Sequence, residues 1–177
     1  MKNDRTRCLV ASALFLALAL VLPFLTGQIP EIGNMLCPMH IPVLLAGFFC
    51  GWPWGLAVGF IAPLLRSLLF GMPVMFPGAA AMALELACYG AVSGFLYALL
   101  PKKKASIYIS LIAAMILGRL VWGAARFVFA FFGTQAFGLA AFWAGAFTSA
   151  VPGILLQLIL VPLLVMAVHK SRFAAKA

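Results

Sequence analysis

The stretch GAAAMALELACYGAVSGFLYALL, residues 78–100, is an apolar run long enough to cross a bilayer, and it carries a carboxylate, Glu85, near its start. The next apolar run, residues 106–132, contains two arginines, Arg119 and Arg126. Charges inside hydrocarbon are costly, so they usually face a cavity or a partner and mark a substrate path. These two runs predict a membrane protein built around a polar pocket.

The composition of the whole chain supports a membrane location. Hydrophobic residues make up 66% of the 177 residues, charged residues only 8%, and the mean hydropathy is +1.18. Too little polar surface remains for a soluble domain. The net charge of +9 would suggest nucleic acid as the partner of a soluble chain. Here most basic residues lie in short segments that flank apolar runs, which indicates membrane topology and no nucleic-acid partner.

The cysteines do not indicate a metal site. Their spacing has neither a CxxC pattern nor a Cys/His metal-binding pattern, and most of them lie in or beside apolar runs, where a free cysteine behaves as a small hydrophobe; they are Cys8, Cys37, Cys50 and Cys88. Cys37 and His40 are close in sequence, but two ligands without a third do not make a metal centre. No metal and no cofactor are therefore predicted.

Six apolar runs predict six transmembrane helices in a single integral membrane domain, residues 1–177, of the all-α class. The runs cover residues 8–27, 40–50, 56–70, 78–100, 106–132 and about 140–168. The first is too long for a signal peptide and has no small-residue cleavage site, and the second is short for a span. The irregular stretch 28–39 is expected to be a long outer loop that covers a site. Residues 51–55, GWPWG, are expected to break the second run from the third.

Basic residues orient these six helices. The amino terminus, the loop with Lys102, Lys103 and Lys104, and the carboxyl terminus fall on one side and hold nine of the twelve basic residues. By the positive-inside rule that side is cytoplasmic, so both termini are expected in the cytoplasm. Arg126 and Glu85 then lie in the outer half of the membrane.

The candidate ligand contacts come from two helical faces and the outer loop. Arg119, Trp122 and Arg126 share one face of the fifth run, at i, i+3 and i+7. Glu85 and Tyr89 share a face of the fourth run. The arginine excess suits a ligand with a carboxylate or phosphate, which arginine can bind through two hydrogen bonds.

Each of these candidates also has a structural interpretation. Glu85 could hold a hydroxyl or amine of the ligand, or form an ion pair with Arg66, Arg119 or Arg126. Trp122 and Tyr89 could stack on a ring of the ligand or simply pack. Arg66 could join the site or extend its charge to the membrane surface. Asn34 and His40, in or beside the loop 28–39, complete the set of candidates.

Three segments resemble a known family. Residues 39–47 (MHIPVLLAG), 59–73 (GFIAPLLRSLLFGMP) and 82–90 (MALELACYG) are similar to the substrate-binding S components of energy-coupling factor (ECF) transporters. The resemblance implies a high-affinity vitamin-binding subunit in the bacterial cytoplasmic membrane. Its implied partners are a transmembrane coupling protein, which would meet the small-residue face of Ala13 and Ala17, and two ATPase subunits. The sequences of the second to fourth predicted helices are most similar to those of the pantothenate and folate branch of this family.

Within that family the substrate stays open. Pantothenate fits the arginine excess best, while other vitamins, including pyridoxine relatives and queuosine precursors, remain alternatives. The chain has no Gly-x-x-x-x-Gly-Lys-Ser/Thr phosphate loop, so it is not expected to hydrolyse ATP itself by that mechanism.

Other classes of function are less compatible with the sequence. An enzyme is not expected, because His40 and His169 lie at opposite ends of the predicted fold and no acid pair is present. An ion-coupled small-molecule carrier that acts alone could use Glu85, and it is the alternative hypothesis, although no inverted repeat is evident. A structural assembly protein would not explain the internal charges.

Overall fold

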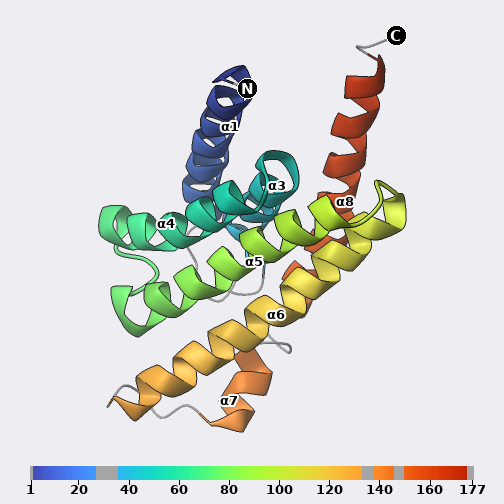
Figure 1. Ribbon diagram of the computed structural model, residues 1–177. Coiled ribbons are helices and arrows are strands. Elements are labelled where there is room, and N and C mark those ends of the chain that lie inside the picture. The colour runs from blue at the N-terminus through green and yellow to red at the C-terminus, as the bar shows by residue number, and fades with distance from the viewer. Residues whose placement is uncertain (1, 27–35, 133–137, 146–149, 175–177) are drawn as a thin grey trace.

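The computed structural model describes residues 2–26, 36–132, 138–145 and 150–174, and all the regular elements in these residues are helices. They are α1 (Lys2–Val21), η1 (Leu22–Thr26), α3 (His40–Cys50), α4 (Trp52–Phe70), η2 (Met75–Ala79), α5 (Ala80–Leu99), α6 (Lys104–Phe131), α7 (Leu139–Trp143) and α8 (Val151–Ala174) (Figure 1). Among the described residues, five helices are long and apolar enough to cross a membrane, and α3 is a sixth, shorter apolar helix. The prediction of an all-α, multi-pass membrane protein is confirmed.

The shortest of these six helices, α3, is also the most buried. Every residue from His40 to Phe48 is buried, and the helix packs against α1, α4, α5 and α8. A helix that is apolar on all sides is stable only when it is surrounded by other elements. The segment that is least like a membrane span in sequence is therefore enclosed by other helices, and Figure 1 shows it between α1 and α8.

Glycines hold α3, α4 and α5 in direct backbone contact. A Cβ atom added to Gly55 of α4 would lie 2.5 Å from the carbonyl oxygen of Gly90 on α5. A Cβ on Gly94 would lie 2.8 Å from the carbonyl oxygen of Gly47 on α3. Gly59 lies in the same way against the carbonyl of Leu86. These positions leave no room for a side chain, so the three helices form one closely packed unit.

The break between α3 and α4 is shorter than predicted. Only Gly51, with φ of 90°, interrupts the two helices, and Trp52 and Pro53 already belong to α4. Proline is tolerated in the first turn of a helix because the N–H it lacks has no partner there. The expectation that all five residues of GWPWG form the break is therefore wrong.

The last predicted run is divided into two elements. The sequence predicts one helix over residues 140–168, whereas α7 ends at Trp143 and α8 begins at Val151 and continues to Ala174. Pro152 follows directly after the start of α8, in a position that suits proline. Residues 146–149, between these two elements, lie outside the described residues.

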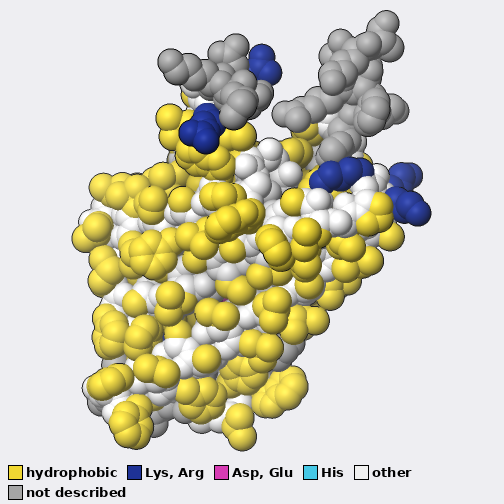
Figure 2. All heavy atoms as spheres, in the orientation of Figure 1, with side chains coloured by type: hydrophobic (Ala, Val, Ile, Leu, Met, Phe, Trp, Pro, Cys, Tyr) yellow, Lys and Arg dark blue, Asp and Glu magenta, His cyan; other side chains and the backbone are white. Residues whose placement is uncertain are grey.

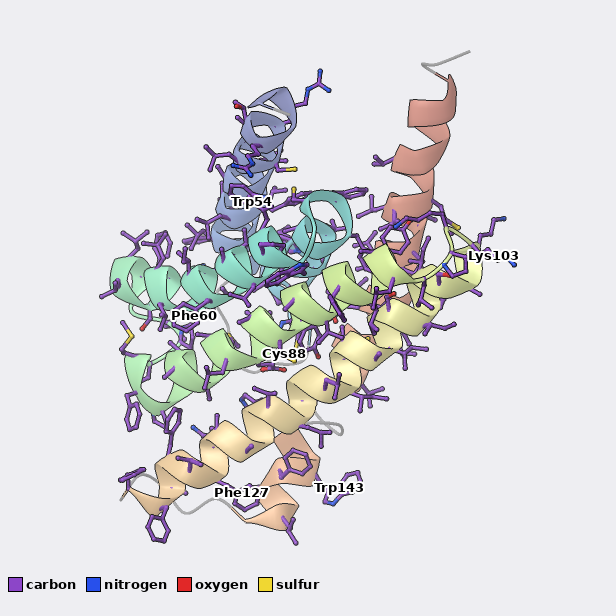
Figure 3. The ribbon with its side chains drawn as sticks, in the orientation of Figure 1. Trp54, Phe60, Cys88, Lys103, Phe127 and Trp143 are labelled. Atoms are coloured by element: carbon purple, nitrogen blue, oxygen red, sulfur yellow. The ribbon has the colours of Figure 1, made fainter. Side chains whose placement is uncertain are left out.

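The basic segments lie together at one end of the molecule. The amino and carboxyl termini are at the same end (Figure 1), and the lysines of the α5–α6 turn lie near it, as Figure 2 and the labelled Lys103 in Figure 3 show. The rest of the face shown in Figure 2 is mainly hydrophobic. This arrangement agrees with the topology expected from the positive-inside rule, and the direction in which the bundle crosses the membrane stays a prediction.

Candidate functional site

Glu85 is the centre of a buried polar cluster where α3, α5 and α6 meet. Its side chain is 1% exposed. Its Oε1 atom lies 3.0 Å from Nη1 of Arg119 on α6 and 3.4 Å from Nε2 of His40 at the start of α3. In Figure 3 the labelled Cys88, three residues further along α5, marks the middle of the bundle. Buried charges of opposite sign are thus paired, as their desolvation requires.

Arg119 also connects the cluster to the chain segment before α3. Its Nη2 atom donates a hydrogen bond to Sγ of Cys37, at 3.5 Å. Cys37 is buried and has φ of 47°, a left-handed conformation that a residue with a side chain rarely adopts. Burial raises the pKa of the Cys37 thiol above its usual value. The thiol is therefore a neutral partner of the guanidinium, and it fixes the entry to α3 against α6.

An aromatic ring closes one side of the cluster. Tyr89 lies one turn after Glu85 on α5, and its fully buried ring stands at 82° to the His40 ring with 4.9 Å between centroids. A Cβ atom on Gly118 of α6 would overlap the Tyr89 ring. Gly118 therefore provides the space that this ring occupies. The prediction that Glu85 and Tyr89 share one face of their helix is confirmed, and both side chains are buried.

Two polar atoms of this cluster have no partner within the described part of the chain. They are Nδ1 of His40 and Nε of Arg119, and both side chains are more than nine-tenths buried. The His40 nitrogen that faces the carboxylate is the one expected to carry the proton, which leaves Nδ1 as an acceptor in the neutral ring. An unpaired buried donor or acceptor costs about 1–3 kcal/mol. The cluster can therefore accept hydrogen bonds from a ligand and donate hydrogen bonds to it.

Arg126 and Trp122 continue the same face of α6 towards its far end. Arg126 lies two turns beyond Arg119 and is half-buried. Trp122 is also half-buried, and its ring stacks on Phe142 of α7 with 6.4 Å between centroids. A Cβ atom on Gly123 would overlap the Phe142 ring, so this glycine lets α7 pack closely on α6. Trp122 thus has at least a packing role, through its contact with Phe142.

The remaining predicted site residues do not join this cluster. Arg66 on α4 is buried, and its Nη1 donates to the carbonyl oxygen of Leu20 on α1 at 2.6 Å, while its guanidinium lies 5.0 Å from the Phe24 ring centroid and 5.4 Å from that of Phe70. It is covered by α1 and η1 and does not extend to an exposed surface, so it links α4 to the end of α1. Asn34 lies outside the described residues.

Sequence reasoning did not identify Cys37 as the second partner of Arg119. The available signal is its position three residues before His40, which in the sequence suggests only a metal site. Among the described residues, no group of three or more His, Cys, Asp or Glu side chains could hold a metal ion. All four cysteines are free thiols.

The fold and the cluster define a class of protein: a multi-pass helical membrane protein with a charged site buried between its helices. A comparison with protein families places the chain within that class. The family model for the ECF transporter, substrate-specific component, matches residues 7–165. The same chain has no significant match among curated proteins or among solved structures.

The chain therefore belongs to the substrate-specific (S) components of ECF transporters. It is the substrate-binding subunit of an ATP-driven importer, works with the ECF energising module, and is not an enzyme. The resemblance found in the three sequence segments is confirmed at the level of the family.

Proposed function

We propose that the Glu85 cluster is the substrate site and that it binds a vitamin-like molecule with an anionic group, arriving from outside the cell. The proposal rests on the buried charged side chains where α3, α5 and α6 meet. Two of their nitrogen atoms, His40 Nδ1 and Arg119 Nε, have no partner among the described residues. Charged side chains that lie within the hydrocarbon layer of a membrane usually mark substrate paths. Pantothenate, which carries one carboxylate, is the best candidate ligand.

The charges of the site favour an anion. Glu85 is the only acidic side chain that the structure describes, and it is already paired with Arg119. With Arg126 on the same face of α6, two arginines and one carboxylate give a formal charge of +1. Arginine binds a carboxylate through two parallel hydrogen bonds, and such bonds are strong where water is excluded. Arg126 is therefore proposed as the main ligand contact, and Arg119 as a contact that also holds Glu85.

We further propose that α1 is the surface that meets the coupling protein. Ala13 and Ala17 are exposed and lie four residues apart on one face of α1. In the described chain α1 packs against α3 and α4, and Figure 1 shows it at the edge of the bundle. Small side chains let a second helix approach closely in a membrane. The opposite face of α1 is thus available to a partner.

A binding experiment tests the site. The purified protein is first screened by thermal shift against a vitamin panel that includes pantothenate, because a tight ligand raises stability by RT ln(1 + [L]/Kd). Arg126→Met and Arg119→Met are then titrated with the ligand found. Each variant should lose about 2–5 kcal/mol of binding free energy, or at least about tenfold in affinity, for the loss of one partner of a desolvated charge pair.

The matched control is Arg66→Met, which removes a buried arginine that has its contacts elsewhere. It should lower the melting temperature but leave the affinity unchanged. If Arg126→Met and Arg119→Met both bind the ligand as tightly as the parent protein, the site lies elsewhere.

A further inference from the structure

Gln157 of α8 is a buried amide whose carbonyl oxygen has no hydrogen-bond donor in the described structure. The residue is 1% exposed, and its Oε1 atom is unpaired. Ile154, Val161 and Val165, at i−3, i+4 and i+8, pack into the hydrophobic core. Gln157 therefore lies on the core-facing stripe of α8, whose span Val151–Val168 is otherwise apolar. An apolar side chain there would avoid the cost of an unpaired acceptor, which is about 1–3 kcal/mol.

The inward face of α8 belongs to the same core as the Glu85 cluster. α8 packs against α3 and α6, the helices that carry His40 and Arg119. The core into which its stripe packs includes Tyr89, whose ring contacts the His40 ring. Gln157 is thus a buried polar residue on a helix that packs against two of the three helices that form the Glu85 cluster.

The unpaired atoms on three helices make a complementary set. Gln157 Oε1 and, in the neutral ring, His40 Nδ1 are acceptors, whereas Arg119 Nε–H is a donor. A ligand that satisfies them must donate hydrogen bonds as well as accept them. A carboxylate alone accepts only, so it cannot pair with either acceptor.

A hydroxyl is the group that fits best. An ammonium would donate, but it would add a positive charge to a site with a formal charge of +1, and like charges at close range repel. A hydroxyl donates one hydrogen bond and accepts others, so it can bond to Gln157 and to a nearby donor at the same time.

We propose that Gln157 is a specificity-determining residue that accepts a hydrogen bond from a hydroxyl of the substrate, so that the site selects hydroxylated carboxylates. This inference rests on the proposed substrate site. It extends that site to α8 and assigns a second recognition group besides the anion. A site with buried groups that bond to a hydroxyl rejects the analogue that lacks it, because the protein groups are then left unpaired.

Two probes separate the hydroxyl from the carboxylate. Pantothenate carries two hydroxyls, an amide and a carboxylate, and N-(3,3-dimethylbutanoyl)-β-alanine keeps the same skeleton, amide and carboxylate without the hydroxyls. Both are titrated calorimetrically into the purified parent protein, Gln157→Met and Ser110→Ala. Ser110 is the control, because it is also a fully buried polar residue whose hydroxyl has no partner among the described residues, but it lies near the Lys104 end of α6, nine residues before Arg119.

The parent protein should bind pantothenate at least about tenfold more tightly than the deoxygenated probe, as expected for a hydroxyl held by buried groups. Gln157→Met should weaken pantothenate binding about 5- to 150-fold and change the affinity for the deoxygenated probe less than about threefold. Ser110→Ala should change neither. If Gln157→Met does not yield folded protein, Gln157→Leu takes its place in the same comparison.

Four results would overturn the inference. Three of them come from the titrations: equal affinity of the parent protein for the two probes, an unchanged pantothenate affinity in the Gln157 variant, and an equal loss for both probes in that variant. A parent protein that binds neither probe but binds another vitamin of the panel also refutes it, while the proposed substrate site stands. A parent protein that binds no vitamin of the panel instead contradicts the proposed substrate site itself.

Discussion

The ion pair between Glu85 and Arg119 should be a major determinant of stability, and a double-mutant cycle measures its contribution. The two side chains are 1% and 8% exposed, and the charged atoms are 3.0 Å apart. Glu85→Gln keeps the shape of the side chain but leaves the guanidinium without its counter-charge. Arg119→Met removes the cation and leaves the carboxylate with His40 alone. The double variant is neutral at both positions.

The size of the effect follows from burial. Breaking a buried pair by removing one partner costs about 3–5 kcal/mol, because the remaining charge stays desolvated and uncompensated. For a protein of this length, 1 kcal/mol shifts the melting temperature by about 2–4 °C, so each single variant should melt about 6–20 °C below the parent protein. The double variant should melt above both single variants, since no charge is left unpaired.

Thermal unfolding of the purified proteins without ligand, followed by intrinsic tryptophan fluorescence, provides the measurement. Arg66→Met is the control, because its contacts are with Leu20, Phe24 and Phe70. Its effect should add to that of Glu85→Gln without coupling. Single variants that melt within about 1 °C of the parent protein, or a double variant whose loss is the sum of the two, would refute the assignment of Glu85 and Arg119 as a stabilising pair.

Three further predictions concern topology, partnership and the Cys37 thiol. In a cysteine-free background, a membrane-impermeant maleimide added outside the cell should label Met75→Cys and spare Lys103→Cys; the opposite pattern would reverse the orientation. Replacing Ala13 and Ala17 with tryptophan should abolish assembly with the coupling protein, measured by co-purification, and leave ligand affinity unchanged, because bulk prevents close helix approach. Assembly that survives the double substitution would exclude this face of α1. Burial and the raised pKa keep Cys37 as a thiol near neutral pH, so N-ethylmaleimide should modify it at least about tenfold more slowly in the folded protein than in the unfolded protein; equal rates would show that Cys37 is exposed.

The helical class and most helix positions could be predicted from the sequence, because hydropathy and length determine which segments can cross a bilayer. The common face of Glu85 and Tyr89 could also be predicted, since residues four apart lie together on a helix. The single-residue break at Gly51 could not be predicted, because the tryptophan and proline that follow it look like part of a loop but begin a helix.

The partner of Glu85 could not be predicted either. Arg66, Arg119 and Arg126 were all compatible with the sequence, and the choice depends on how α4 and α6 cross α5. The structure places Arg119 against Glu85 and gives Arg66 the carbonyl oxygen of Leu20. A main-chain partner of this kind leaves no trace in the sequence. The role of Cys37 was missed for the same reason, since its contact with Arg119 joins residues 82 positions apart.

The glycine contacts among α3, α4 and α5 divide the molecule into parts that differ in how freely they can be redesigned. Gly55 and Gly90 meet through their backbones, so any larger residue there would push α4 away from α5. The carboxylate of Glu85, five residues before Gly90 on α5, is therefore held in a fixed position. α6 and α8 lie outside this contact, so the residues on them that we propose to contact the substrate can be exchanged without separating the three helices. A protein engineer who wishes to change the transported molecule would leave the glycine-packed helices intact and vary Arg126 and Gln157.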